Sequence, residues 1–289
     1  MKKVDNAIIM AAGVSSRFAP LSYEVPKALT EVKGEVLIER QIKQLHESGI
    51  REIYIIVGYK AEMFEYLQDK LGVRLIKNDA YMTRNNHSSI YVAKDIIRNT
   101  YICSADNYFI DNPFEEYVDE SYYAAVYAEG ETREWCMQTN AEGYITCVDV
   151  GGKDAWYMLG HAFWSEEFSK QFLCFLDAEY DLPRTKDCFW ENIFMDHLDI
   201  LKMKMRKYPA DYIFEFDSID ELRQFDATYI TDTRSTILKK IAVQLNGTEA
   251  EIVEIEPLKN MSTEVVGIRF RFRAEYYCYT YSNCLLRRI

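Results

Sequence analysis

The sequence lacks an apolar run long enough to cross a membrane, and its opening residues, MKKVDNAIIM, turn polar too soon for a secretory signal. Its 7 cysteines are scattered without a Cys-x-x-Cys pair or a Cys/His cluster, which disfavours a zinc site and a disulfide framework. We therefore expect reduced, mostly buried thiols in a cytoplasmic protein. Acidic residues outnumber basic ones, with 46 Asp and Glu against 34 Lys and Arg. The net charge of -12 argues against general nucleic-acid binding.

Two common phosphate-binding motifs are absent too. No Gly-Lys-Ser/Thr follows a glycine-rich loop, and no G-x-G-x-x-G occurs. Residues 6–30 instead read NAIIMAAGVSSRFAPLSYEVPKALT, an apolar strand that leads into a loop of small residues. Such a loop is usually only a tight turn, and a lone Arg or Lys is usually solvated. Together with the fixed charges of Arg17 and Lys27, however, its closely spaced backbone N–H groups predict a polyphosphate site.

Strand and helix patterns alternate through residue 104, which predicts an α/β fold with a Rossmann-like, mostly parallel sheet. Ligands of such sheets bind at the carboxyl ends of the strands. We therefore expect three loops to share one edge of the sheet, namely Ala11–Arg17, Gly58-Tyr59 and Ala105–Tyr108. The expected helices in this part are Val36–His46, Ala61–Leu71 and Ser88–Ile97.

The pattern changes after Asp111 to short strand-like runs with Gly and Asp turns. We interpret residues 112–165 as an antiparallel insertion that extends the sheet and forms a lid. Helices are expected from Ser165, which starts with an approximate capping pattern, from Phe189 and from Ile219. The predicted organisation is a domain of residues 1–230 followed by a small α+β appendage, residues 231–289, with one helix and three strands.

Two acidic positions fit a magnesium site. Asp106 follows an apolar strand in Ser-Ala-Asp-Asn-Tyr. Asp217 directly follows the predicted strand Ile213–Phe216, and alternation along it places Glu215 and Asp217 on the same face. The alternatives are a turn residue for Asp106 and a helix N-cap for Asp217. Glu215 is the weaker of the three candidate ligands.

The N-terminal combination of A-A-G, Ser-Arg and Pro-Lys-Ala-Leu resembles the signature of nucleotidyltransferases that join an NTP to a phosphorylated small molecule. The resemblance implies a nucleotide-diphospho-sugar transferase type of fold, Mg²⁺ dependence, and metal-binding roles for Asp106 and Asp217. The family usually has A-A-G-x-G-x-R, whereas this chain has Ser15 at the second glycine. A serine there costs more than glycine if the position requires positive φ. The phosphate-binding residues so implied are Ala11, Ala12, Gly13, Ser15, Ser16, Arg17 and Lys27.

A narrower resemblance, to CTP:phosphocholine cytidylyltransferases, extends to about residue 228. It includes NDxYxxxNNxxSxY at residues 78–91, which with Gly58 and Tyr59 implies a cytosine pocket containing Asn85 and Ser89, near Asp106. A quaternary ammonium donates no hydrogen bond, so aromatic faces and a carboxylate hold it. The residues implied for this acceptor site are Trp135, Phe189, Trp190 and Glu191. The family tends to have Tyr-Trp-Asp-Asn where this chain has Phe-Trp-Glu-Asn, and buried aromatic residues are often simply core.

Residues 252–272 resemble the opening strands of choline/ethanolamine-kinase-like proteins, although no kinase catalytic loop follows. We interpret residues 231–289 as a segment that originated as a truncated kinase N-lobe. In this chain we expect it to pack on the main domain or to form a homodimer contact. The predicted activity is synthesis of CDP-choline and pyrophosphate from CTP and phosphocholine. The alternatives are transfer to 2-aminoethylphosphonate or phosphoethanolamine, a sugar-1-phosphate nucleotidyltransferase, and a non-catalytic nucleotide-binding domain.

Overall fold

The computed structural model describes residues 1–262 and 264–289. These residues form two compact units, each built from two stretches of chain. The first unit combines Met1–Gly13 with Ile38–Phe214, and the second combines Val14–Leu37 with Glu215–Ile289. Residues 231–289, which we predicted as an appendage, therefore belong to the same unit as the segment that carries Arg17 and Lys27.

The first unit is built on a seven-stranded sheet of order β12-β10-β11-β7-β2-β5-β6. Strand β2 (Asn6–Ala11) is parallel to both β5 (Ile53–Val57) and β7 (Thr100–Ser104), and β5 is parallel to β6 (Arg74–Lys77). Strands β2, β5 and β7 are almost wholly buried, which explains their continuous apolar sequences. The predicted mostly parallel sheet is thus confirmed.

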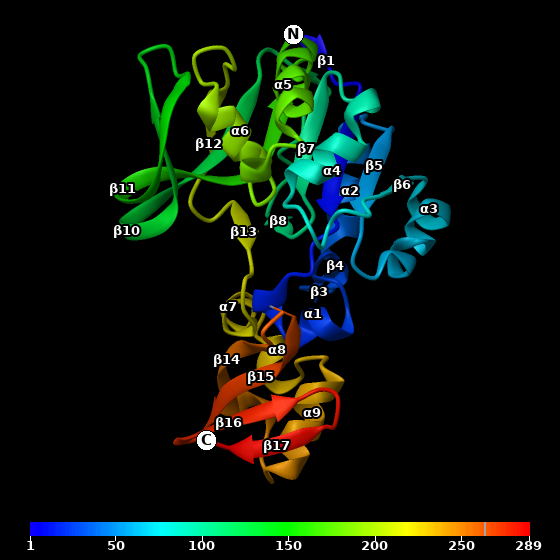
Figure 1. Ribbon diagram of the computed structural model, residues 1–289, viewed down its shortest axis with the longest axis vertical. Helices are drawn as coiled ribbons and strands as arrows, with labels where there is room; N and C mark the ends of the chain where they lie inside the picture. The colour runs from blue at the N-terminus through cyan, green and yellow to red at the C-terminus, as the bar shows by residue number, and fades with distance from the viewer. Residues whose placement is uncertain (263) are drawn as a thin grey trace. The chain divides into compact units, whose positions relative to one another are not determined.

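Two long antiparallel strands, β10 (Tyr122–Thr139) and β11 (Ile145–Trp164), extend the sheet through β7 (Figure 1). The sequence predicted four short strands here, and that part was wrong. Glycines at positive φ, Gly130 and Gly151, mark register shifts within the pair rather than chain reversals. The antiparallel extension itself is confirmed, and its role as a lid stays a prediction.

The helices agree with the sequence in most places. Ser165 is the N-cap of α5 (Glu166–Glu179) and accepts a hydrogen bond from the Phe168 N–H, as its capping pattern indicated. The predicted helix Ser88–Ile97 is instead a short α4 (His87–Val92) followed by a 3-10 turn, because Ala93 leaves helical geometry at φ -101 and ψ 1. Trp164, Trp190, Phe172 and Phe194 pack in the core between α5, α6 and the sheet.

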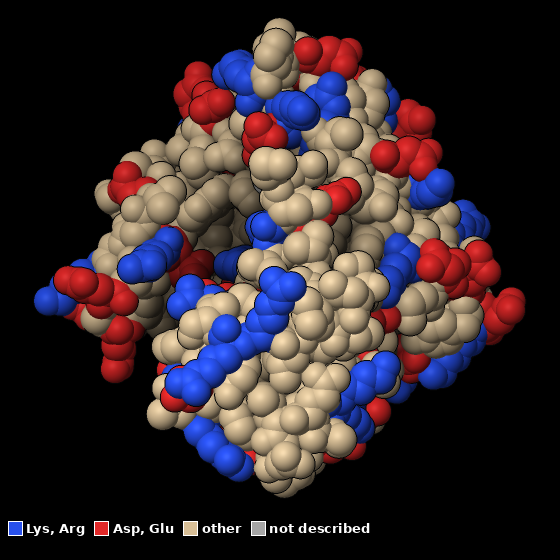
Figure 2. Space-filling model, turned by 60° about the horizontal axis from the view of Figure 1, so that its bottom comes forward, with Lys and Arg blue, Asp and Glu red and all other residues tan. Residues whose placement is uncertain are grey.

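The second unit contains a four-stranded antiparallel sheet of order β14-β15-β16-β17 and helix α9 (Thr236–Gln244) (Figure 1). The three predicted strands are confirmed, and the sequence missed β17 (Leu285–Arg288). Alternation along β15 (Val265–Phe272) buries Ile268, Phe270 and Phe272 and leaves Arg269 exposed. Figure 2 shows a row of Lys and Arg side chains crossing mostly uncharged surface on one face of the molecule.

The remaining elements of the first unit are β1 (Lys2–Lys3), η3 (Ala61–Phe64), α3 (Tyr66–Leu71), η4 (Lys94–Ile96), β8 (Asn107–Phe109), β9 (Tyr117–Val118), η5 (Pro183–Thr185), α6 (Trp190–Asp196) and β12 (Lys204–Lys207). Those of the second unit are η1 (Ser16–Phe18), α1 (Leu21–Glu24), η2 (Lys27–Leu29), β3 (Glu31–Val32), β4 (Glu35–Val36), α7 (Ile219–Phe225), α8 (Thr228–Thr231), η6 (Glu249–Glu251), β14 (Ile252–Lys259) and β16 (Glu275–Thr280). Two elements, α2 (Leu37–Glu47) and β13 (Ile213–Glu215), lie mostly in the first unit and have one terminal residue in the second. Within residues 1–262 and 264–289, no helix has the length and apolar character needed to span a membrane.

Candidate active site

The loops that follow β2 and β5 meet at the carboxyl edge of the first unit's parallel strands. The backbone N–H of Tyr59 donates to the carbonyl of Ala12 at 3.0 Å. A Cβ on Gly58 would lie 2.9 Å from the same carbonyl oxygen and 2.7 Å from the Tyr81 ring. Only glycine fits at that position, so Gly58 is required for this close approach whether or not a ligand binds. After β7, the half-buried Asp106 follows Ala105, whose N–H donates to Met10.

Ser15 occupies the left-handed region at φ 50 and ψ 51. The sequence left open whether this position requires positive φ, and the structure shows that it does. A glycine adopts this conformation without the steric cost that a Cβ carries. The loop therefore keeps a backbone shape that suits glycine although the residue has changed, and this shape directs the chain into η1, which contains Arg17.

Within the second unit, the two predicted phosphate-binding cations are both paired with carboxylates. Arg17 Nη1 lies 2.7 Å from Asp217 Oδ2. Lys27 Nζ lies 3.3 Å from Asp217 Oδ1 and 3.5 Å from Glu215 Oε1. The Lys27 side chain is only 4% exposed, whereas that of Arg17 is 74% exposed. Asp217 is thus shared by a buried lysine and an exposed arginine.

Asp217 is not the N-cap of α7, contrary to the structural alternative. Ser218 fills that position and forms a capping box with Glu221, whose carboxylate also accepts from the Asp217 N–H at 2.7 Å. The Asp217 carboxylate is therefore not used by the helix and remains directed at the two cations. This arrangement leaves it able to exchange partners when an anion or a divalent cation arrives.

In the first unit, the predicted acceptor residue Glu191 is a buried carboxylate on α6. Its oxygens accept from the Tyr123 hydroxyl at 3.1 Å and from the Asn86 side-chain amide at 3.3 Å. No Lys or Arg among the described residues forms an ion pair with it. Burial raises the pKa of Glu191 to about 7, against the lowering effect of these hydrogen bonds. When a cationic ligand binds beside a buried carboxyl group of this kind, the attraction between the charges stabilises the ionised form.

The three aromatic candidates occupy two different environments. Trp135 and Phe189 meet edge to face with centroids 5.5 Å apart, and Phe189 is 42% exposed. Trp190 is 1% exposed and stacks on Tyr123 at 5.6 Å, with Trp164 at its edge. The structure therefore places Trp190 in the hydrophobic core, where it supports the Tyr123 ring whose hydroxyl reaches Glu191.

The predicted base-binding segment is tied to the residues that precede Glu191. Asn85 donates from its side chain to the Asp187 carbonyl at 3.1 Å, and His87 Nδ1 lies 2.7 Å from the Cys188 carbonyl. Ser89 is buried and accepts from the Asn78 amide at 3.2 Å. These contacts connect the segment before α4 to the segment before α6. Burial lowers the pKa of His87, so this imidazole is neutral near pH 7.

Sequence reasoning missed two partners of Glu191. Tyr123 lies in the middle of a strand that reads as apolar core. Asn86 lies between Asn85 and Ser89, the two residues that we selected in this segment. Its side-chain oxygen also accepts a hydrogen bond from the Trp190 N–H at 2.7 Å. The sequence feature that could have pointed to Asn86 is the pair Asn85-Asn86, because two adjacent amide side chains at the start of a helix point in different directions.

The described residues, 1–262 and 264–289, contain no cluster of three or more His, Cys, Asp or Glu side chains able to hold a metal ion. The nearest approach to such a donor set in the second unit is the Glu215 and Asp217 pair, both within 3.5 Å of Lys27 Nζ. Carboxylate oxygens suit Mg²⁺, and phosphate oxygens and water normally complete its coordination. The pair therefore fits a metal that arrives with a polyphosphate better than a preformed cation site.

The fold and these residues agree with the family that comparison identifies. A family model described as a MobA-like NTP transferase domain matches residues 7–153. The chain therefore belongs to the MobA-like NTP transferase family of nucleotidyltransferases.

Within that family, the chain is 36% identical over 220 residues to a choline-phosphate cytidylyltransferase from Streptococcus pneumoniae, covering 76% of this chain and 96% of the relative. It is 35% identical over 234 residues to a 2-aminoethylphosphonate cytidylyltransferase from Lancefieldella rimae, covering 80% of this chain and 95% of the relative. A solved structure of CTP:phosphocholine cytidylyltransferase from Streptococcus pneumoniae superimposes with a TM-score of 0.75 at 36% identity, over 78% of this chain and 99% of that one.

Proposed function

We propose that this protein is a cytidylyltransferase that converts CTP and phosphocholine to CDP-choline and pyrophosphate. The observation that carries the choice of acceptor is the edge-to-face pair of Trp135 and Phe189, and Glu191 adds a buried carboxylate that forms no ion pair with a Lys or Arg among the described residues. Trp135 and Phe189 lie in the same unit, and Phe189 exposes its ring. Aromatic faces with a carboxylate match a quaternary ammonium, each ring contributing about 0.5–2 kcal/mol. The relatives named above support the choice of CTP.

The reaction needs no covalent intermediate on the protein. A phosphate oxygen of the acceptor attacks the α-phosphorus of CTP, and the bond from that phosphorus to the bridging oxygen breaks to release pyrophosphate. The protein's task is to align two anions and to neutralise the charge that develops on them. Arg17 and Lys27 supply positive charge, and the small residues from Ala11 to Gly13 with Ser16 offer backbone N–H groups to the phosphates.

Mg²⁺ is the cofactor that we propose, with Asp106 and Asp217 as protein ligands and Glu215 as a weaker third. When bound, such an ion neutralises charge on the phosphate oxygens. The Asp217 carboxylate lies within ion-pair distance of Arg17 and Lys27, and the Glu215 carboxylate lies within ion-pair distance of Lys27. An arriving triphosphate can take over Arg17 and Lys27 and so release these carboxylates for the metal.

The second candidate is transfer to a primary-amine acceptor, 2-aminoethylphosphonate or phosphoethanolamine. One relative carries the first of these names. Glu191 would also serve this acceptor, because a primary ammonium prefers oxygen acceptors, and Phe189 lacks the phenol hydroxyl that the resemblance to phosphocholine cytidylyltransferases implies at this position. The kinase-like origin of residues 252–272 and the homodimer contact remain predictions.

A one-pot competition separates the two candidates. Phosphocholine and 2-aminoethylphosphonate are supplied at equal concentration with limiting CTP and Mg²⁺, and the two products, CDP-choline and the cytidylyl phosphonate, are quantified by chromatography. Excess CDP-choline supports the proposal, and excess of the phosphonate product overturns the acceptor while keeping the chemistry. The Trp135→Leu variant provides the matched comparison, because loss of one ring should reduce the preference for the methylated acceptor by about two- to tenfold.

A further inference from the structure

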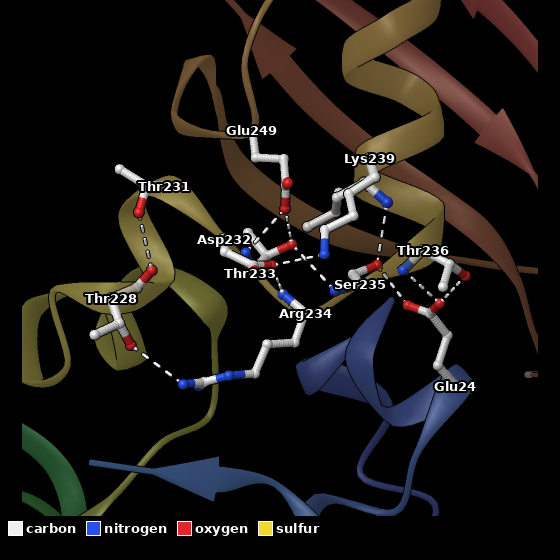
Figure 3. Close-up of polar contacts among 11 residues, drawn as sticks. Glu24, Thr228, Thr231, Asp232, Thr233, Arg234, Ser235, Thr236, Lys239 and Glu249 are labelled. Atoms are coloured by element: carbon white, nitrogen blue, oxygen red, sulfur yellow. Dashed lines mark hydrogen bonds and ion pairs between the residues drawn. The ribbon is translucent and has the colours of Figure 1, made fainter. Parts of the chain in front are cut away.

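The carboxylate of Glu24 lies at the N-terminus of helix α9 in the second unit. Its Oε2 accepts from the Ser235 hydroxyl at 2.5 Å, and its Oε1 accepts from the Thr236 backbone N–H at 2.8 Å (Figure 3). The Thr236 hydroxyl donates to the same Oε1. Helix N-termini favour negative charge because their first N–H groups lack intrahelical partners. Glu24 thus joins α1 to α9 across more than two hundred residues of sequence.

The residues that receive Glu24 are themselves fixed. Ser235 is fully buried and is the N-cap of α9, where its hydroxyl accepts from the Leu238 N–H at 3.1 Å. Thr233, also fully buried, donates from its backbone N–H and its hydroxyl to Glu249 (Figure 3). Lys239 of α9 pairs with Asp232 at 2.8 Å. The start of α9 is therefore fixed by hydrogen bonds of Ser235 and Thr233 and by the ion pair of Lys239 with Asp232.

Further contacts tie the same N-terminal segment to residues after 228. The Tyr23 ring stacks on Tyr281, with centroids 4.0 Å apart and planes at 27°. The Glu31 carbonyl accepts from the Tyr229 hydroxyl at 2.6 Å and from Arg234 at 3.2 Å. Strand β14 also lies against η1, which contains Arg17. The segment from Ser16 to Glu31 is thus held along its length.

The carboxylates opposite Arg17 and Lys27 are anchored by the same part of the chain. Arg223 of α7 is 8% exposed and donates to the carbonyls of Ile252 and Glu249, both at 2.7 Å. Asp220 of α7 accepts from the Glu254 N–H at 3.0 Å. Helix α7 begins directly after Asp217 and Ser218. Both halves of the ionic cluster therefore depend on residues 231–289 for their placement.

We propose that Glu24 is a positioning residue, through which the start of α9 and the C-terminal sheet hold Arg17 and Lys27 in place for the triphosphate. Its carboxylate accepts hydrogen bonds from Ser235 and Thr236, and it lies three residues before Lys27 in the chain. The inference rests on the proposed function for the roles of Arg17 and Lys27. Residues 231–289 would then contribute to the reaction by positioning Arg17 and Lys27, without contacting the reacting atoms themselves.

The test compares the variants Glu24→Ala, Glu24→Gln and Thr236→Val with the unsubstituted protein. The matched control variant is Arg271→Ala. Arg271 pairs with Glu254 at 2.8 Å inside the same sheet, and among the described residues it has no hydrogen bond or ion pair with residues 14–37. Amide hydrogen exchange of residues 14–37, the CTP dissociation constant and steady-state kinetics are measured for each. The exchange experiment needs no turnover, so it separates failure of this inference from failure of the proposed function.

We expect Glu24→Ala to speed exchange in residues 14–37, to weaken CTP binding about tenfold and to lower kcat further. Glu24→Gln, which keeps an acceptor for Thr236, should recover most of the affinity. Because Glu24 acts through Thr236, adding Thr236→Val to Glu24→Ala should cost little more. The inference is overturned if Glu24→Ala matches Arg271→Ala, with reduced thermal stability but unchanged exchange in residues 14–37 and unchanged CTP affinity. Additive effects of the two substitutions would overturn it as well.

Discussion

The ammonium of Lys27 lies 3.3 Å from the Asp217 carboxylate, although the two residues are separated by 190 positions in the sequence. Arg17 contacts the other oxygen of the same carboxylate at 2.7 Å. The two positive charges that we assign to the triphosphate are thus compensated by the residue that we assign to the metal. Ligand binding in this account is an exchange of ionic partners, which makes the cluster sensitive to the loss of any member.

Replacing Lys27 with methionine removes the buried charge and keeps the length of the side chain. We expect turnover to fall about 10²–10³-fold, the cost typical of losing one group that stabilises developing charge. Some stability should also be lost, because Glu215 and Asp217 then lack their buried partner. Pyrophosphate release and thermal unfolding are measured together, with Lys240→Met as control because Lys240 is exposed on α9. Near-normal turnover of Lys27→Met would contradict the assignment of this loop.

Asp217→Asn separates the two roles of the shared carboxylate. Without metal, the substitution weakens the pairing of this side chain with Arg17 and Lys27, so CTP affinity in chelator should rise by up to about fivefold, as expected from an ion pair worth about 0.2–1 kcal/mol. With Mg²⁺, turnover should fall sharply because a proposed ligand is lost. Calorimetric titration of CTP in each condition gives both values. Weaker binding in chelator would show that Asp217 does not compete with the triphosphate.

Ser15→Gly should stabilise the protein. The backbone at Ser15 has φ 50, where a Cβ is unfavourable, whereas glycine loses more entropy on folding. The balance should raise the free energy of unfolding by up to about 1 kcal/mol, with catalysis retained. Chemical denaturation measures the change. A loss of stability would mean that the serine hydroxyl contributes more than the strain costs.

We expect the affinity for the acceptor to depend on pH through the ionisation of Glu191. Burial raises its pKa to about 7, so the free protein holds it protonated below that pH. A cationic headgroup favours the ionised form, and affinity for the acceptor should therefore rise as pH increases toward 7 and then level off. The acceptor phosphate also titrates in this range, so the profile of KM is compared with that of Glu191→Gln. The difference between the two profiles isolates the carboxyl group, and identical profiles would remove Glu191 from the site.

The sequence predicted the parallel sheet because buried strands such as β5 and the amphipathic helices between them have distinct periods. Helix α7 was placed at its observed bounds, since Ser218 and its neighbours carry a strong start signal. The continuity of β10 and β11 was not predictable, because glycine and polar residues at bulges resemble turns. Nor did any local pattern show that Lys27 is buried or that Glu24 meets Ser235, since both depend on contacts between distant segments.

The central claim is tested most directly by measuring pyrophosphate release with Mg²⁺ while CTP, UTP and ATP are each combined with phosphocholine, phosphoethanolamine, 2-aminoethylphosphonate and glucose-1-phosphate. The account predicts a dominant signal for CTP with phosphocholine. A signal only with glucose-1-phosphate, or none with any acceptor while CTP still binds, would contradict it.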